Sequence, residues 1–127
     1  MAHVVLDSTF VIDCMLGDPA ALARLEQVFA EGQQPMVNEV VVCEVRAGLR
    51  EADVAAFEAL LAPTEFVQPG PEVAVKAGAW RADLRQRGRV LSLADALIGA
   101  AADVNGAPVI TRNVRDFELM PIRVESY

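Results

Sequence analysis

Near its N-terminus the chain reads Val4-Val5-Leu6-Asp7, a short apolar run that is typical of a buried strand and that ends in an acid. A second such run, Val109-Ile110-Thr111, is followed within a few residues by Asp116. In open α/β sheets the carboxyl ends of parallel strands meet at one edge, where ligands bind. We therefore expect Asp7 and Asp116, which are far apart in the sequence, to share one site at that edge.

The rest of the chain alternates between strand-like and helix-like segments, which indicates an α/β fold. Strands are predicted at residues 4–6, 36–37, 66–67, 109–111 and 122–124. Helices are predicted at residues 20–30, 40–50, 52–61, 71–87 and 92–104. The connections are short and no linker or internal repeat interrupts them, so we expect one domain over residues 1–127. Right-handed crossovers would cover both faces of a parallel sheet with helices.

The composition fits such a core and argues against several classes of protein. Hydrophobic residues make up 54% of the chain but aromatic residues only 6%, which is typical of Ala-, Val- and Leu-rich helices on a buried parallel sheet. No apolar run approaches the roughly 20 residues that span a bilayer. Met1-Ala2-His3 provides no basic segment of the kind that opens a secretory signal. We therefore expect a cytoplasmic protein without a membrane segment.

The scarcity of histidine and cysteine argues against nucleophilic triads and tetrahedral zinc sites. His3 is the single histidine and lies at the extreme N-terminus, and the two cysteines are well separated. Cys14 and Cys43 lie in apolar helical segments, so we expect both to be free, buried thiols. Hard oxygen ligands remain, and these suit Mg²⁺ or Mn²⁺.

Two further acids, Glu44 and Asp95, interrupt apolar helical segments. Valine, alanine and glycine occupy the helical neighbour positions of Glu44, which predicts that its side chain points along a buried face. An ionised carboxylate left there without a partner would cost several kcal/mol or shift its pKa strongly upward. A divalent cation or a specific arginine is therefore needed beside Glu44.

Helix capping is the alternative explanation for three of the four acids. Each lies close to a hydroxyl or amide side chain that could begin a helix: Asp7 before Ser8-Thr9, Asp95 after Ser92, and Asp116 after Asn113. Glu44 escapes this explanation because it lies inside a predicted helix. Asp95 also has Leu91 and Ile98 at neighbouring helical positions, so capping does not remove its apolar surroundings.

Together the four acids could hold one or two divalent ions, with water and substrate phosphate as the remaining ligands. Such ions lower the pKa of water and stabilise the attacking and leaving oxygens of a phosphodiester. The net charge of −7 argues against unaided nucleic-acid binding, although two divalent ions would neutralise the four acids. Four arginines lie close together in the sequence and form a local basic cluster: Arg81, Arg85, Arg87 and Arg89. This cluster is either a solvated helix face or a contact for phosphate.

Four segments resemble the PIN-domain nucleases, specifically the VapC-type toxins. They are Asp7-Ser8-Thr9-Phe10-Val11-Ile12, Val42-Cys43-Glu44-Val45, Leu93-Ala94-Asp95-Ala96-Leu97-Ile98 and Thr111-Arg112-Asn113-Val114-Arg115-Asp116-Phe117. The resemblance implies a three-layer α/β/α sandwich with a central parallel sheet in the order 3-2-1-4-5. It also implies a Mg²⁺- or Mn²⁺-dependent endoribonuclease that acts as the toxin of a type II toxin–antitoxin module. The implied partners are RNA, a second copy of the chain, and a VapB-type antitoxin in a hetero-oligomer.

By the same resemblance, the catalytic metal site would consist of Asp7, Glu44, Asp95 and Asp116. Asp7 and Asp95 are the first candidates for direct contact with the metal. The supporting residues would be Ser8, Thr111 and Asn113. A receiver domain would need a lysine near the last strand, and a haloacid-dehalogenase-like phosphatase would need an acid at position 9. The chain offers neither. The remaining alternative is a non-catalytic PIN-like binding subunit whose acids hold a structural cation, and RNA cleavage distinguishes the two.

Overall fold

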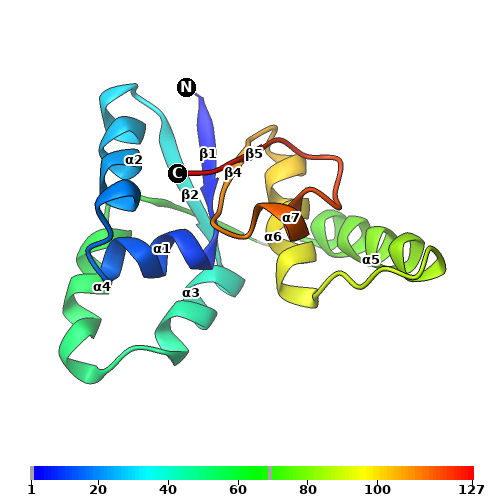
Figure 1. The fold of residues 1–127 in the computed structure, drawn as a ribbon, viewed down its shortest axis with the longest axis horizontal. Helices are drawn as coiled ribbons and strands as arrows, with labels where there is room; N and C mark the ends of the chain where they lie inside the picture. The colour runs from blue at the N-terminus through cyan, green and yellow to red at the C-terminus, as the bar shows by residue number, and fades with distance from the viewer. Residues whose placement is uncertain (1, 69) are drawn as a thin grey trace.

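The computed structural model describes residues 2–68 and 70–127, and a five-stranded parallel sheet lies at its centre (Figure 1). The strands are β1 (His3–Leu6), β2 (Gln34–Asn38), β3 (Glu65–Val67), β4 (Val109–Ile110) and β5 (Val124–Glu125). Their order is β3-β2-β1-β4-β5, as the resemblance implied. Each predicted strand overlaps an observed one.

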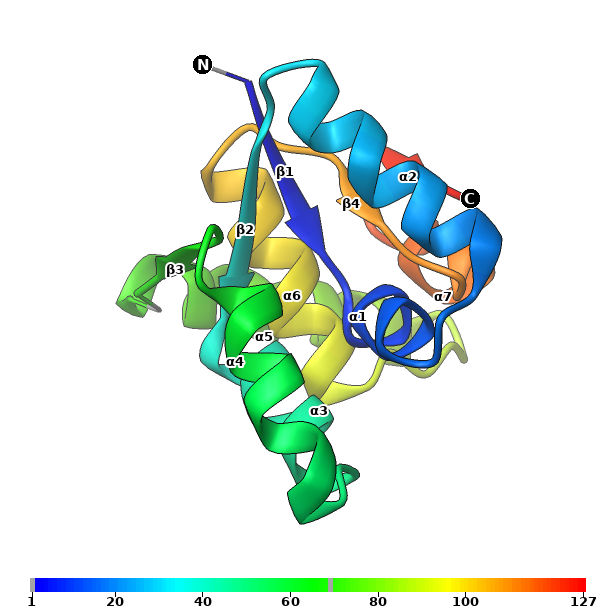
Figure 2. The ribbon, with the colours of Figure 1, turned by 90° about the vertical axis from the view of Figure 1, so that its left-hand side faces the viewer.

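Helices cover both faces of the sheet. They are α1 (Ser8–Met15), α2 (Pro19–Ala30), α3 (Glu39–Ala47), α4 (Val54–Leu61), α5 (Pro71–Gln86), α6 (Leu93–Val104) and α7 (Val114–Phe117); a 3₁₀ turn (Glu51–Asp53) precedes α4. Figure 2 shows α2 and α4 in front of the sheet and α5 and α6 behind it. The predicted three-layer α/β/α architecture is confirmed, and right-handed crossovers between parallel strands are its physical origin.

The strand order reverses between β1 and β4, and this switch point positions the acids. Leu6 pairs with Ile110 across the two strands. The backbone N–H of Asp7 then donates to the carbonyl oxygen of Ile110 at 3.0 Å, which continues the register by one residue. Asp7 and Thr111 therefore leave the sheet side by side, in the crevice where open α/β sheets bind ligands.

The helix boundaries follow the predictions except near the site. The helix predicted over residues 40–50 ends at Ala47, because the N–H groups of Gly48 and Leu49 turn back to the carbonyls of Val45 and Arg46. The sequence periodicity assigns no bounds to α1, whose apolar residues run almost without interruption, or to α7, which has only four residues.

The core lies between the sheet and the two helical layers. Its completely buried large side chains come from all three layers and include Leu6, Phe10, Val37, Ile98, Ile110 and Phe117. Burial of a side chain of this size contributes roughly 1.5–3 kcal/mol to stability. Alanines and Gly99 on α6 let this helix approach its neighbours closely. Within residues 2–68 and 70–127, no helix combines the length and apolar character needed to cross a bilayer.

The two cysteines differ in environment, although both are free. Cys14 is buried, and burial, followed by the charges of Asp13 and Asp18, raises its pKa to about 11. Cys43 is exposed, so the prediction that both thiols are buried is wrong for this residue. The cause is the narrow core-facing stripe of α3, where Val41 and Val45 are the buried residues.

Candidate active site

Asp7 is a buried carboxylate at the point where β1 becomes α1. It is the N-cap of α1, and its Oδ2 atom accepts from the backbone N–H of Thr9 at 3.4 Å. The same Oδ2 accepts from the hydroxyls of Thr9 and Thr111, each at 2.7 Å. Within the described chain, Oδ1 has no hydrogen-bond donor, so this oxygen is available to a cation.

Residues after β4 extend this network. The Thr111 hydroxyl, which is fully buried, accepts from the backbone N–H of Asn113 at 2.8 Å. The Asn113 side-chain amide donates to Oδ2 of Asp116, also at 2.8 Å. Asn113 therefore orients the Asp116 carboxylate through its side chain rather than capping α7.

Glu44 lies on the solvent side of α3, so the prediction of a buried face is wrong for this residue. Val41 and Val45 turn toward the core, and Glu44 precedes Val45 by one residue, a rotation of roughly 100°. Its Oε1 accepts from the hydroxyl of Ser8 at 2.6 Å. The apolar neighbours of Glu44 therefore do not impose burial, and a hydroxyl, rather than an arginine, contacts its carboxylate.

Asp95 is held in the first turn of α6. The hydroxyl of Ser92, the N-cap, accepts from the backbone N–H of Asp95 at 3.1 Å. Burial raises the pKa of the Asp95 carboxyl to about 6, and the charge of Asp7 adds to this shift more than those of Asp116 and Glu44 do. The other three predicted acids therefore all repel the ionised form of Asp95, and a bound cation would relieve this repulsion.

Helix capping at Asp7 and beside Asp95 does not prevent these acids from forming a site. Asp7 caps a helix with Oδ2 and leaves Oδ1 unused, while Ser92 supplies the cap beside Asp95. No group of three His, Cys, Asp or Glu side chains in residues 2–68 and 70–127 is already assembled as a metal-binding set. The donors around the crevice are carboxylate and hydroxyl oxygens, which suit a hard divalent ion that retains water ligands. The residues thus fit such an ion.

Sequence reasoning missed two supporting side chains, Thr9 and Asn38. Thr9 bonds Asp7 and lies 3.2 Å, hydroxyl to hydroxyl, from Thr111. Asn38, buried at the end of β2, caps α3 by accepting from Val41 N–H at 3.2 Å and donates to the Leu97 carbonyl on α6 at 3.4 Å. It thereby connects the helices that carry Glu44 and Asp95. The signal for Asn38 was a polar residue directly after a predicted strand, and the signal for Thr9 was a hydroxyl two positions after Asp7.

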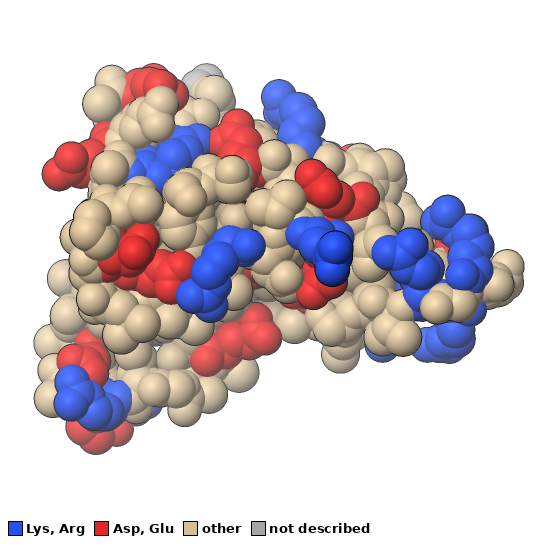
Figure 3. Space-filling model, viewed as in Figure 1, with Lys and Arg blue, Asp and Glu red and all other residues tan. Residues whose placement is uncertain are grey.

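The basic cluster lies at one end of the molecule. Figure 3 shows Lys and Arg side chains gathered over the C-terminal end of α5. Arg81 donates to the Leu91 carbonyl at 3.0 Å, and Arg87 pairs with Asp83 at 2.7 Å. Both of these arginines are therefore engaged within the protein. Among the described residues, Arg85 and Arg89 form no ion pair.

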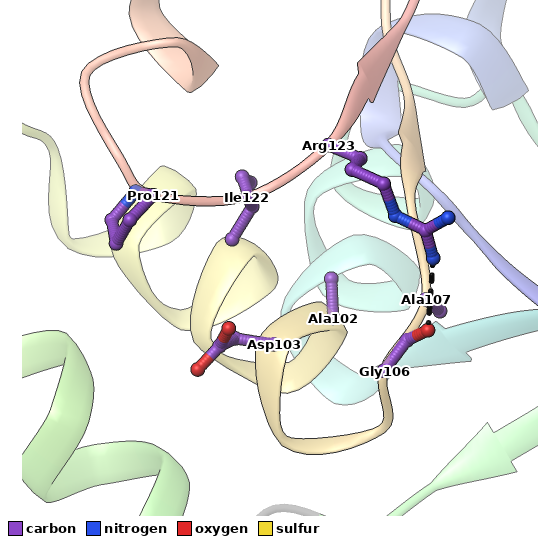
Figure 4. A pocket seen from close by; sticks show the side chains of 7 residues that line it. All are labelled: Ala102, Asp103, Gly106, Ala107, Pro121, Ile122 and Arg123. Atoms are coloured by element: carbon purple, nitrogen blue, oxygen red, sulfur yellow. Dashed lines mark hydrogen bonds between the residues drawn. The ribbon is translucent and has the colours of Figure 1, made fainter.

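A separate pocket of about 370 Å³ lies at the far end of α6 from Asp95 (Figure 4). Its lining includes Asp103, Pro121 and Ile122, and Arg123 donates to the Gly106 carbonyl at 3.1 Å across its rim. Asp103 is paired with Lys76. This pocket therefore contains no free cluster of acids and is not the candidate active site.

Comparison with known proteins agrees with this geometry. The model of the PIN domain matches residues 4–121. The chain belongs to the PIN-domain family. Ribonuclease VapC19 of Mycobacterium tuberculosis is 32% identical to it over 117 residues, which cover 92% of this chain and 94% of the relative. This similarity places the PIN domain among the VapC-type members.

Solved structures share the fold. VapBC2 of Rickettsia felis, solved with a DNA fragment from its promoter, superposes with a TM-score of 0.88 at 19% identity and covers 98% of both chains. A toxin–antitoxin complex from Klebsiella pneumoniae gives a TM-score of 0.78 at 25% identity and covers 93% of this PIN domain and 92% of that chain. The three-layer fold is thus shared with solved structures of low sequence identity.

Proposed function

We propose that this PIN domain is a metal-dependent endoribonuclease, the toxin of a type II toxin–antitoxin module that acts in the cytoplasm. One observation supports it most: at the strand switch point two hydroxyls hold Oδ2 of the buried Asp7 carboxylate, and the charges of Asp7, Asp116 and Glu44 raise the pKa of Asp95. The identity to a named ribonuclease over nearly the whole chain supports the choice of RNA as substrate.

In this proposal Asp7 and Asp95 hold Mg²⁺ or Mn²⁺, and Glu44 and Asp116 complete the acidic site. A bound divalent ion would lower the pKa of a water molecule and neutralise charge on the scissile phosphate. Oδ1 of Asp7 would hold the ion, because two hydroxyls and a backbone N–H engage Oδ2. The side chains that orient the acids are Ser8, Thr9, Thr111 and Asn113.

Cleavage of RNA by purified variants tests the proposal. Asp7→Asn and Glu44→Gln should abolish Mg²⁺- or Mn²⁺-dependent cleavage of total RNA, while circular dichroism shows a folded protein. Asp103→Asn is the matched control, because Asp103 lies two turns beyond Asp95 on α6 and is paired with Lys76. Cleavage by Glu44→Gln at the normal rate would refute the site. Metal-induced stabilisation without cleavage would favour the binding subunit with a structural cation.

The antitoxin partner also has a candidate surface. An apolar groove of about 480 Å³ lies between α1 and α3, and its lining includes Ile12, Leu16, Val45 and Leu49. Leu16 is 78% exposed, which is unusual for a leucine unless another chain covers it. We infer that an antitoxin segment places apolar side chains here and an arginine on the acids. Co-purification followed by a nuclease assay tests this, and a complex that cleaves RNA as fast as the free protein would refute occlusion.

The homodimer would use a different apolar face. Val75 on α5 is 72% exposed and lines a shallow depression with Pro71, Ala79 and Trp80. Burial of this face against a second copy would remove apolar surface from water. Light scattering should therefore give twice the chain mass, and Val75→Glu should give the mass of one chain.

A further inference from the structure

Arg112 lies directly beside the acidic site. It follows Thr111 in the sequence, and its backbone N–H donates to the Thr9 hydroxyl at 3.1 Å. That same hydroxyl donates to Asp7. The backbone of Arg112 is therefore fixed to the metal-site network, while its side chain is 62% exposed.

The guanidinium of Arg112 is held by a chain of contacts that leads into the core. Its Nη1 donates to Oδ1 of Asp13 at 2.9 Å, although the Asp13 side chain is only 10% exposed. The other Asp13 oxygen, Oδ2, accepts from the hydroxyl of Tyr127. The Tyr127 ring packs edge-on against Phe10, with 4.9 Å between ring centroids, and Phe10 is completely buried.

The guanidinium side of this ion pair is exposed to solvent, where an ion pair contributes little to stability. A guanidinium carries five N–H donors, and within the described chain only Nη1 is engaged by a side chain. The remaining donors suit the bidentate contact that arginine makes with phosphate. Two other arginines are engaged by carboxylates: Arg46 pairs with Glu51, and Arg24 pairs with Glu125.

We propose that Arg112 binds a backbone phosphate of the RNA next to the cleaved bond, and that Asp13, held by Tyr127, is a positioning residue that orients the Arg112 guanidinium. This inference rests on the proposed ribonuclease function. The four acids repel a polyanion, and a cation whose backbone is joined to Asp7 through the Thr9 hydroxyl would offset part of that repulsion.

The two possible roles of Asp13, as a nearby negative charge or as a positioning residue, predict opposite changes of KM in Asp13→Asn. If Asp13 acted only as a negative charge near the site, its removal would strengthen RNA binding and lower KM. If it orients Arg112, its removal frees the guanidinium and raises KM. Tyr127→Phe keeps the Asp13 charge but removes one hydrogen bond, so it should raise KM by a smaller factor than Asp13→Asn.

The experiment measures KM and kcat with Mn²⁺ and a fluorophore–quencher single-stranded RNA that the wild-type protein cleaves. Arg112→Ala should raise KM about tenfold, the factor expected for one charge-assisted hydrogen-bonded contact, with a smaller change in kcat. Arg112→Lys should recover part of this loss. The dependence of kcat/KM on salt should also become shallower by about one phosphate contact in Arg112→Ala. Arg123→Ala is the charge-matched control, because Arg123 lies at the opposite edge of the sheet beside Gly106.

Thermal melting of each variant separates misfolding from loss of binding. An unchanged KM in Arg112→Ala relative to Arg123→Ala, or a lowered KM in Asp13→Asn, would overturn this inference and leave the nuclease assignment intact. A wild-type protein that cleaves no RNA under any metal condition would instead overturn the proposed function, and this inference with it.

Discussion

The hydroxyl of Ser8 donates a 2.6 Å hydrogen bond to the carboxylate of Glu44, a residue 36 positions later in the sequence. Ser8 is the first residue of α1 and is buried, whereas Glu44 lies on the exposed side of α3. The bond therefore fixes the position of an acid that the core does not hold. Ser8 acts on the site through Glu44 in the same way that Thr111 acts through Asp7.

Removal of this hydroxyl should weaken both the fold and the proposed reaction. Ser8→Ala should lower the free energy of unfolding by about 1 kcal/mol, the usual net value of one hydrogen bond, because Glu44 loses its donor. RNA cleavage should fall but persist. Ser8→Thr keeps the hydroxyl and should retain most of the activity. Urea denaturation and initial cleavage rates measure the two effects, and equal losses in both variants would contradict this role.

Divalent metal should stabilise the folded chain. A ligand at 100 times its Kd that binds only the folded state adds about 2.7 kcal/mol, so the thermal midpoint of chelated protein should rise when Mn²⁺ is added. The rise should shrink in Asp7→Asn and Asp95→Asn and persist in Asp103→Asn. The same rise in all three variants would place the metal elsewhere.

Asp95 should make the metal-free protein less stable as pH increases. Its pKa is raised to about 6 in the folded state from an ordinary value of 3.8, so the folded state binds the proton more tightly than the unfolded state. Stability is therefore lost as pH rises from about 4 through 6. Asp95→Asn cannot ionise and should melt higher than wild type at pH 7 but not at pH 4. Differential scanning fluorimetry in chelator measures this difference.

Glu58→Gln is a suitable control for the pH experiment, because Glu58 is an exposed acid on α4. Its difference in melting temperature from wild type should stay constant between pH 4 and 7. A pH-independent difference in Asp95→Asn as well would show that burial and the neighbouring charges do not perturb the Asp95 carboxyl.

Gly99 should not tolerate a side chain. A Cβ atom there would overlap Sδ of Met120 and lie 2.6 Å from its Cε atom, and Met120 is buried. Sδ and Cε are the flexible end of Met120 and would have to shift within the core, so Gly99→Ala should lower the free energy of unfolding by about 1 kcal/mol, the lower limit for overpacking. Gly78→Ala on α5, where nothing lies within 4 Å, should instead stabilise by about 0.5–1 kcal/mol. Urea melts of both variants provide the comparison, and a neutral Gly99→Ala would refute the close packing of α6.

Apolar periodicity and polar residues at strand ends are local properties, and for this reason much of the architecture was predictable. Both ends of each predicted strand lie within two residues of the observed ends. The long helices α2, α5 and α6 followed from their 3.6-residue pattern. The bounds of α1 and α7 did not, because apolar residues run almost without interruption through α1 and α7 has only four residues.

Asp7 and Asp116 could be assigned to one edge from the sequence because parallel strands must end there together. Only the tertiary structure decided the exposure of Glu44, which depends on the rotation of α3 about its axis rather than on the residues around it. The same holds for the contact of Arg112 with Asp13 and of Tyr127 with Asp13, which join residues 99 and 114 positions apart. Such contacts depend on strand register and on how helices dock against the sheet, and no local pattern in the chain encodes either.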